Sequence, residues 1–291
     1  MSEAPRFPPN LAMLVSIVAV STASILIRWS NAPAVIIAMY RMVFSVLMLL
    51  PFFLRNGGMG KLGKVGTRNL LGLGAVGVVL AIHFASWITS LGLTSVASSV
   101  IFVHIDPLFV AVVSHFFLND RINRRVLAGI IVSLVGVSII TLGDASSGGS
   151  NLTGDLLALV GGVMLGIYIL GGRHFRGYLD LTTYVTPVYA TAAVVLFLMS
   201  LATGAPLTGY PAREYVLFII IALVPMIFGH TLYNWTLKYV SAPVVSVSLL
   251  GEPVGASILA FLFLNETPNN QVMLGGIVTL FGILLSSSRN D

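Results

Sequence analysis

The chain has 291 residues, of which 57% are hydrophobic and only 9% are charged, a composition far from that of soluble globular domains. Its formal net charge of +5 comes without a basic cluster interleaved with aromatic side chains, which argues against nucleic acid as a partner. Cysteine is absent, which excludes disulfides, thiolate catalysis and cysteine-ligated metal. The length is therefore best divided into membrane-spanning helices of about 20 residues each.

Hydropathy, interrupted at Gly, Pro and charged residues, predicts ten such spans. They cover about residues 11–29, 33–54, 69–91, 95–117, 125–143, 153–172, 182–202, 214–237, 242–264 and 271–287. Residues 1–10 lack the basic start and the small-residue cleavage site of a secretory signal. We therefore expect the first span to remain in the mature protein.

The distribution of Lys and Arg predicts the orientation of these spans. If the N-terminus is cytoplasmic, twelve cationic residues fall on the inner side and only Arg28 and Arg213 on the outer side, as the positive-inside rule requires. The inner residues are Arg6, Arg55, Lys61, Lys64, Arg68, Arg121, Arg124, Arg125, Arg173, Arg176, Lys238 and Arg289. Both termini then face the cytoplasm. Arg41, about two turns inside the second span, could pair with a carboxylate, but we expect it to snorkel outward.

The second half of the chain repeats the first. Asp106-Pro107 in the fourth span recurs as Glu252-Pro253 in the ninth, 146 residues later, and the same offset links segment 118–120 to segment 264–266. Five spans per copy would insert the second copy upside down. The sequence therefore predicts an all-α integral membrane protein of ten transmembrane helices arranged as two inverted five-helix repeats, residues 1–145 and 146–291. The Gly- and Ser-rich stretch 144–151 is the expected hinge between them.

The two acidic residues of the repeat, Asp106 and Glu252, are the candidates for ion coupling, because a carboxylate inside a membrane is costly unless it is used or neutralised. Glu252 is the better proton carrier in this interpretation. Alternatively, it is permanently paired or protonated and only braces the helix. Pro107 and Pro253 are predicted hinges, since proline removes a helical hydrogen bond, although a static kink fits equally well.

Polar and aromatic side chains at helical spacing predict a substrate cavity between the spans. Ser95, Ser99, Phe102 and Asp106 share one face of the fourth span, and Ser241, Val245, Ser248 and Glu252 share the matching face of the ninth. His83 and Trp87 lie one turn apart on the third span. The expected substrate-binding residues are His83, Trp87, Ser99, Phe102, Tyr168, His230, Trp235 and Ser248. The alternative is that these side chains only join helices by hydrogen bonds. His104 and His115 fall on other faces of a straight helix and are left out.

Small residues predict close helix packing at the end of each half. Gly129, Ser133 and Gly136 recur as Gly275, Thr279 and Gly282. Such a seam lets two helices approach closely, and it could also mediate dimerisation. The nucleotide-binding pattern G-x-x-x-x-G-K-[ST] and the hydrolase patterns H-E-x-x-H and G-x-S-x-G are missing. We therefore expect neither enzymatic activity nor a cofactor or metal.

The whole pattern resembles the drug/metabolite transporter superfamily, specifically its EamA-type members, and is most similar to bacterial amino-acid exporters of the YddG type. The resemblance rests on Asp-Pro-Leu-Phe at 106–109, Glu-Pro-Val at 252–254 and the Phe-Leu-x-Asp/Glu turns that end at Asp120 and Glu266. This chain departs from the usual pattern in one respect, because Asn119 and Asn265 replace the usual Gly before the acidic residue of the turn.

The resemblance implies a multi-pass protein of the bacterial inner membrane that exports small metabolites from the cytoplasm by alternating access, without ATP. Aromatic or neutral amino acids are the expected substrates, with drug-like compounds as an alternative. The implied partners are the substrate and the lipid bilayer, and the protein would be a monomer or a weak homodimer. Two other classes stay open, namely a non-transporting assembly or lipid-linked protein, and a flippase or nucleotide-sugar carrier. The last would need more cationic groups deep in the membrane than Arg41.

Overall fold

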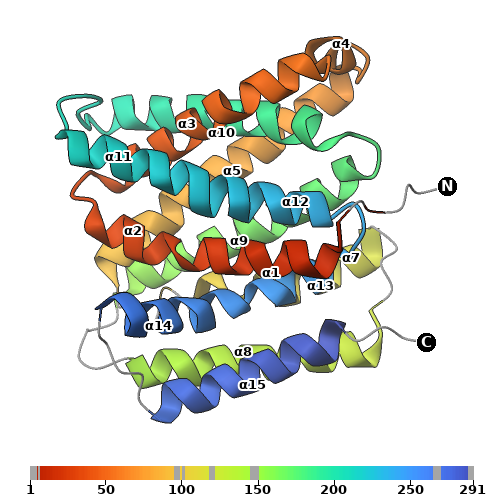
Figure 1. Cartoon of the computed structure of the whole chain (residues 1–291), viewed down its shortest axis with the longest axis vertical. Helices are drawn as coiled ribbons and strands as arrows, with labels where there is room; N and C mark the ends of the chain where they lie inside the picture. Colours follow the sequence, from red (N-terminus) through yellow and green to blue (C-terminus); the bar gives the residue numbers. More distant parts are fainter. Residues whose placement is uncertain are drawn as a thin grey trace.

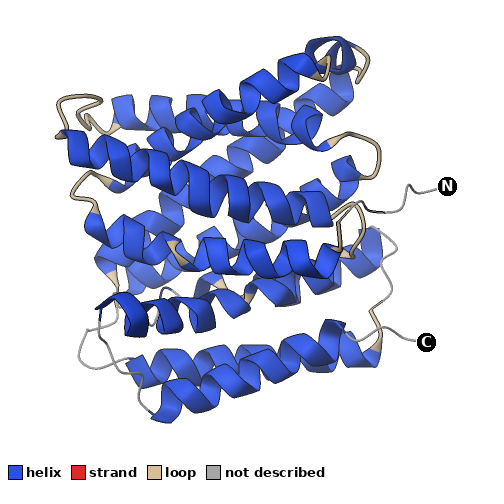
Figure 2. Ribbon diagram, viewed as in Figure 1, coloured by secondary structure: helices blue, strands red, loops and turns tan. Residues whose placement is uncertain are grey.

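The computed structural model describes residues 5, 7–94, 99, 102–117, 122–144, 151–264 and 270–287, and every regular element among them is a helix (Figures 1 and 2). Seven helical stretches are long and apolar enough to cross a membrane, and shorter apolar helices cover Asp106–Phe117 and Asn270–Ser286. In chain order the helices are α1 (Pro9–Ser21), α2 (Ala23–Trp29), α3 (Ala34–Arg55), α4 (Gly58–Gly63), α5 (Thr67–Leu93), α7 (Asp106–Phe117), α8 (Arg124–Asp144), α9 (Leu152–Arg176), α10 (Leu181–Ala202), α11 (Ala212–Ile221), η1 (Ala222–Thr231), α12 (Leu232–Thr236), α13 (Ala242–Leu249), α14 (Gly251–Leu264) and α15 (Asn270–Ser287).

The described helices agree with the spans expected from hydropathy to within about four residues at either end. The short helix α4 was not expected, because it lies in the basic stretch between two spans. The fourth span is described only at residues 99 and 102–117, so the predicted position of Ser95 lies outside the described residues. The same holds for residues 145–150 of the expected hinge and for the two acidic turns.

Two spans are interrupted at equivalent places. A turn at His104 and Ile105 precedes α7, and a single turn residue, Leu250, separates α13 from α14. Each interruption comes directly before one of the two acid-proline pairs. Proline lacks an N–H group and clashes with the preceding helical turn, so a break on its N-terminal side is expected. The kinks predicted at Pro107 and Pro253 are therefore present, whereas movement about them stays a prediction.

The rod formed by α11, η1 and α12 contains a π-helix with Pro225 inside it. A simple kink was expected there, but the helix instead widens over Ala222–Thr231. A wider turn leaves backbone carbonyls available to other groups, and such segments are frequent at functional sites. The Gly229 carbonyl accepts a hydrogen bond from Ser16 Oγ at 2.9 Å, and the Pro225 carbonyl accepts one from Arg41 Nη2 at 3.4 Å.

Helices α8 and α15 pack directly against each other along the predicted small-residue seam (Figure 1). A Cβ atom added at Gly136 would lie 2.4 Å from the backbone nitrogen of Thr279, and one added at Gly282 would lie 2.5 Å from that of Ser133. Ser133 Oγ also donates a hydrogen bond to the Thr279 carbonyl at 3.2 Å. The seam thus joins the two halves of one chain, so it is already covered and is not available to a second copy.

This seam should be sensitive to a single methyl group. We expect Gly136→Ala to lower the free energy of unfolding by about 1–3 kcal/mol, because the added carbon overlaps backbone atoms of α15. Gly74→Ala is the matched control, since a Cβ there has no neighbour within 4 Å and replaces Gly inside a helix, which should stabilise by about 0.5–1 kcal/mol. Thermal unfolding of both purified variants measures the difference. Equal melting temperatures would contradict the close packing of α8 and α15.

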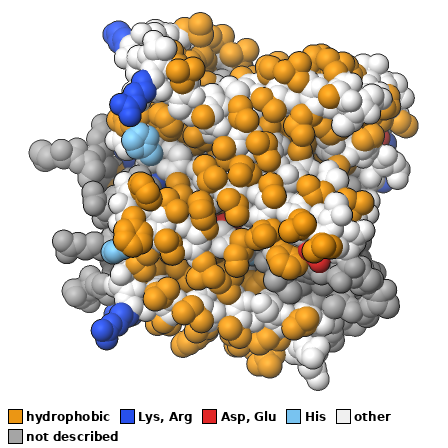
Figure 3. Space-filling view, turned by 180° about the vertical axis from the view of Figure 1, so that it is seen from behind, with side chains coloured by type: hydrophobic (Ala, Val, Ile, Leu, Met, Phe, Trp, Pro, Cys, Tyr) orange, Lys and Arg blue, Asp and Glu red, His pale blue; other side chains and the backbone are white. Residues whose placement is uncertain are grey.

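The remaining helices surround a central region to which both halves contribute. α5 packs on α9, α1 packs on η1, and α3 packs on α10. The outer faces of the bundle are hydrophobic, and Lys, Arg and His side chains lie mainly along one edge (Figure 3). That edge is the side at which α1 begins and α15 ends (Figures 1 and 3). An apolar belt with cations at one edge is what a positive-inside membrane protein presents.

On this basic side, Asp180 joins the short helix α4 to the start of α10. Its carboxylate accepts hydrogen bonds from Lys61 Nζ at 2.8 Å and from the Thr183 backbone nitrogen at 3.1 Å, which caps α10. Partial burial raises the pKa of this carboxyl, but the hydrogen bonds from Lys61 and Thr183 outweigh that effect and hold the pKa below its ordinary value.

We expect Asp180→Ala to lower the free energy of unfolding by about 1 kcal/mol at neutral pH, mainly through loss of the helix cap. A carboxyl with a lowered pKa stabilises the folded state above its unfolded-state pKa of about 3.9, and this stabilisation is lost as the pH falls. The difference between Asp180→Ala and the wild type should therefore shrink below pH of about 4. Unfolding curves recorded across the acidic range test this, and a difference that grows with acidity would contradict it.

Candidate functional site

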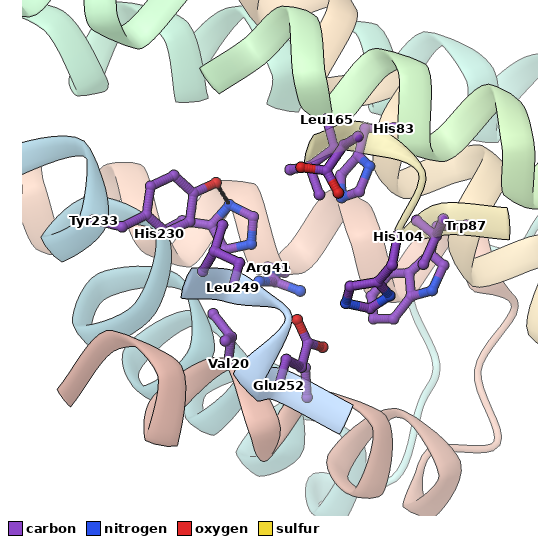
Figure 4. A pocket seen from close by; sticks show the side chains of 13 residues that line it. Val20, Arg41, His83, Trp87, His104, Leu165, His230, Tyr233, Leu249 and Glu252 are labelled. Carbon is purple, nitrogen blue, oxygen red and sulfur yellow. Dashed lines mark hydrogen bonds between the residues drawn. The ribbon is translucent and has the colours of Figure 1, made fainter. Parts of the chain in front are cut away.

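A small cavity lies in the centre of the bundle (Figure 4). About 30 Å³ of it is open to the centre of a water molecule, which is room for roughly two waters. Its walls come from both halves of the chain. The lining residues among those described are Val20, Ala23, Arg41, His83, Trp87, Val103, His104, Asp106, Leu165, His230, Tyr233, Leu249 and Glu252.

Imidazole and aromatic rings form one part of the wall. His83 and Trp87 lie one turn apart on α5, and their rings are stacked with centroids 6.1 Å apart and planes inclined by 8°. His83 Nδ1 lies 2.8 Å from the Gly161 carbonyl. A carbonyl oxygen can only accept, so Nδ1 carries the hydrogen and donates. His230, at the end of η1, is hydrogen-bonded through Nδ1 to the Tyr233 hydroxyl at 2.7 Å (Figure 4).

The two equivalent acidic residues face the same cavity from opposite halves. Asp106, at the start of α7, is almost completely buried and accepts a hydrogen bond from Ser246 Oγ. Glu252, in the first turn of α14, is only partly buried because its side chain points into the cavity (Figure 4). The sequence prediction that both acids lie near one central site agrees with these positions.

Arg41 does not snorkel, and that expectation is wrong. Its side chain is 1% exposed and reaches the cavity from α3. The guanidinium carbon lies 4.2 Å from the centre of the Phe84 ring, a favourable cation–π contact. The physical reason is the position of α3, which packs against α5, α10 and η1 on its Arg41 side, so the side chain has no path along lipid to the surface.

Five further predicted residues are not part of the described cavity wall. Tyr168 is buried behind it and accepts a hydrogen bond from Asn234 Nδ2 at 2.7 Å. Ser99 shares a hydrogen bond of 2.7 Å with Ser90, and Ser248 Oγ donates to the carbonyl of Val244 at 2.7 Å. These contacts are the helix-joining role that we gave as the alternative.

The other two lie further out. Phe102 is 37% exposed on the outside of the bundle, and Trp235 packs its ring against Tyr239 at 4.8 Å. By contrast, His104 lines the cavity although the sequence analysis left it out. A straight helix would turn His104 away from Asp106, but the turn at residues 104–105 redirects it. The proline at 107 was the signal that the helical register could not be extrapolated through this point.

The cavity combines both signs of charge with flat apolar surface. Arg41 lies on one wall, Glu252 and Asp106 lie on others, and the rings of Trp87 and three histidines complete it. Among the described residues, no three His, Asp or Glu side chains come together in a way that could hold a metal ion. The arrangement suits reversible binding of a small polar molecule with an apolar part.

Comparisons with known proteins place this bundle. Residues 8–142 and, separately, residues 152–288 match the EamA-like transporter family. An uncharacterised transporter of Archaeoglobus fulgidus is 26% identical over 260 residues, which is 87% of each chain. A probable terminal-alkyne amino-acid exporter of Streptantibioticus cattleyicolor is 25% identical over 193 residues, 64% of this chain and 62% of that protein.

A solved crystal structure superposes on the chain with a TM-score of 0.78, covering 96% of both chains at 16% identity, which is a likeness of fold. The two family matches cover nearly the whole chain and correspond to its two halves. They identify a transporter rather than an enzyme. The protein is a multi-pass integral membrane protein that belongs to the EamA-like transporter family.

Proposed function

We propose that the protein exports small amino acids, aromatic or neutral, from the cytoplasm across a bacterial inner membrane by alternating access. The observation that carries this proposal is the central cavity, whose walls come from both halves and hold opposite charges beside flat rings. A zwitterion with an apolar side chain matches that combination. The amino-acid exporter among the relatives supports the same substrate class.

Alternating access follows from the arrangement of the halves, for which we propose ten spans in two inverted repeats. Met13 Sδ, near the start of α1, accepts a hydrogen bond from Thr236 Oγ1 at 3.9 Å, and Arg176 Nε, at the end of its equivalent α9, donates to the Asn234 carbonyl at 3.1 Å. Because both contacts are made with α12, α1 and α9 run in opposite directions. Repeat partners also pack on each other, α8 on α15, α7 on α13 and α3 on α10. An in-plane two-fold axis would produce this pattern.

The size of the cavity also supports movement. Space for about two waters cannot hold an amino acid, so the walls must separate to admit one. The breaks before Asp106 and at Leu250 lie in those walls and are suited to such a change. The basic edge of the bundle supports a cytoplasmic location for both termini.

Efflux from cells tests this proposal. Cells that express the protein are loaded with radiolabelled phenylalanine, leucine or alanine, and the rate of release is compared with cells that carry an empty vector. Faster release of at least one amino acid is expected. Val160→Ala is the control for expression, since Val160 is 41% exposed on the outer face of α9. Release that matches the empty vector for all amino acids, with the protein present in the membrane, would refute amino-acid export.

A further inference from the structure

Arg41 carries a charge into the cavity without a matching partner. Nε and Nη1 of its guanidinium are buried and have no hydrogen-bond partner, although they bear three N–H groups between them. Its third nitrogen, Nη2, makes only the long hydrogen bond of 3.4 Å to the Pro225 carbonyl. Buried polar groups are normally paired, and an arginine that is not paired is an exception that needs an explanation.

No acid among the described residues satisfies this guanidinium directly. The one ion pair found among them joins Lys61 to Asp180 at the surface. Glu252 is the acid that comes nearest in role, since its carboxylate points into the cavity toward Arg41 (Figure 4), but the two do not form an ion pair. Asp106 is already engaged with Ser246. Space therefore remains beside Arg41 for a group that the protein itself does not supply.

The chemistry of that group follows from the donors and from the facing charge. A guanidinium binds carboxylate or phosphate through several parallel N–H groups. Glu252 and Asp106 would repel a phosphate dianion in so small a cavity, because like charges in surroundings of low dielectric constant interact strongly. A monocarboxylate with a cationic group nearby is compatible with both walls. The aromatic wall at His83 and Trp87 would then face the remainder of such a molecule.

We propose that Arg41 is the carboxylate-binding residue of the central cavity, and that Glu252 on the facing wall balances its charge when the cavity is empty and faces the ammonium group when it is occupied. The carboxylate site is inferred from Arg41 alone, whereas the zwitterionic substrate rests on the proposed function. Arg41 thereby determines specificity, since it requires a carboxylate on every transported molecule. Phe84 and Pro225 hold the guanidinium in place for that contact.

The test uses the purified full-length protein and two probes of nearly identical shape, 3-phenylpropionate and its uncharged amide, 3-phenylpropanamide. Calorimetric titration should show that the wild type binds the acid more tightly than the amide. Arg41→Met should lower the affinity for the acid by roughly 10- to 100-fold, which is the usual effect of losing hydrogen bonds to a charged group, and should leave the amide unchanged. Arg41→Lys, which keeps the charge but loses the planar donors, should fall between them.

A structural role would give different results. If Arg41 only supports packing, Arg41→Met without ligand should melt well below the wild type, and the acid and amide should bind alike. We expect the empty variant to melt no lower than the wild type, because it removes an unpaired buried charge. Equal affinity of the wild type for both probes, or failure of both variants to fold, would overturn the proposal. Selective binding that depends on Arg41, with no efflux of any amino acid, would instead leave the carboxylate site intact and refute the proposed function.

Discussion

Replacing Glu252 by Gln is expected to abolish the substrate accumulation that a pH gradient drives, while exchange of substrate between the two sides of the membrane persists. The chain lacks an ATPase motif, so uphill export requires coupling to the gradient of another ion. Glu252 is the acid that points into the cavity, where it can contact both water and substrate. Glutamine keeps the size and hydrogen bonding of this side chain but cannot take up or release a proton.

The structure adds a reason to expect coupling that the sequence did not offer. No second acid lies within one helical turn of Glu252 in the chain, yet Asp106 faces the same cavity from the other half. Two carboxylates at one site can share and pass a proton. Accumulation in proteoliposomes under an imposed pH gradient measures the effect, with Asp106→Asn as the companion variant. An unchanged response to the gradient in well-folded Glu252→Gln would exclude the proton-carrier role and favour downhill transport with Glu252 as a static brace.

Replacing Trp87 by Ala is expected to impair transport of large substrates more than that of small ones. Its ring lines the cavity and stacks with His83, so its loss removes a flat surface against which an aromatic side chain can pack. Such ring contacts contribute about 0.5–1.5 kcal/mol, so transport efficiency for phenylalanine should fall about 3- to 10-fold. Efficiency for alanine should change little, because its methyl group cannot reach the ring.

Trp235→Ala is the matched control for this prediction. Trp235 lies on α12, in the same half as His230, but packs against Tyr239 and is not part of the described cavity wall. Transport of both amino acids should therefore change equally in this variant. If Trp87→Ala also lowered phenylalanine and alanine transport by the same factor, the ring would not be a wall of the substrate site.

The span pattern could be predicted from sequence because it depends on local hydropathy and on the repeat. Asp106 and Glu252 could be placed at one central site for the same reason, since equivalent positions of two repeats meet where the halves meet. This reasoning needs no knowledge of side-chain packing. It also gave the correct faces for His83 and Trp87, which lie on α5, a helix without a break.

The errors arose where the backbone or the packing departs from a straight helix in lipid. His104 was placed on the wrong face because the helix turns at residues 104–105. Arg41 was expected to reach the surface, because its distance from the helix end fits snorkelling equally well and only the neighbouring helices decide the matter. The π-helix around Pro225 has no distinct sequence signal beyond the proline. Tyr168 and Ser99 are polar residues inside the bundle, but hydrogen bonds to other helices, rather than a substrate, account for them.

The central claim is that one cavity between the two halves opens alternately to each side of the membrane. Because the chain has no native cysteine, a single cysteine can be introduced without removing another. Leu165→Cys places a thiol at the cavity wall, and Val160→Cys on the same helix places one on the outer face. A membrane-impermeant thiol reagent is added to the inside or to the outside of proteoliposomes. We predict that Leu165→Cys reacts from both sides and is protected by substrate, whereas Val160→Cys is not protected. Reaction from one side only, unaffected by any substrate, would contradict alternating access through this cavity.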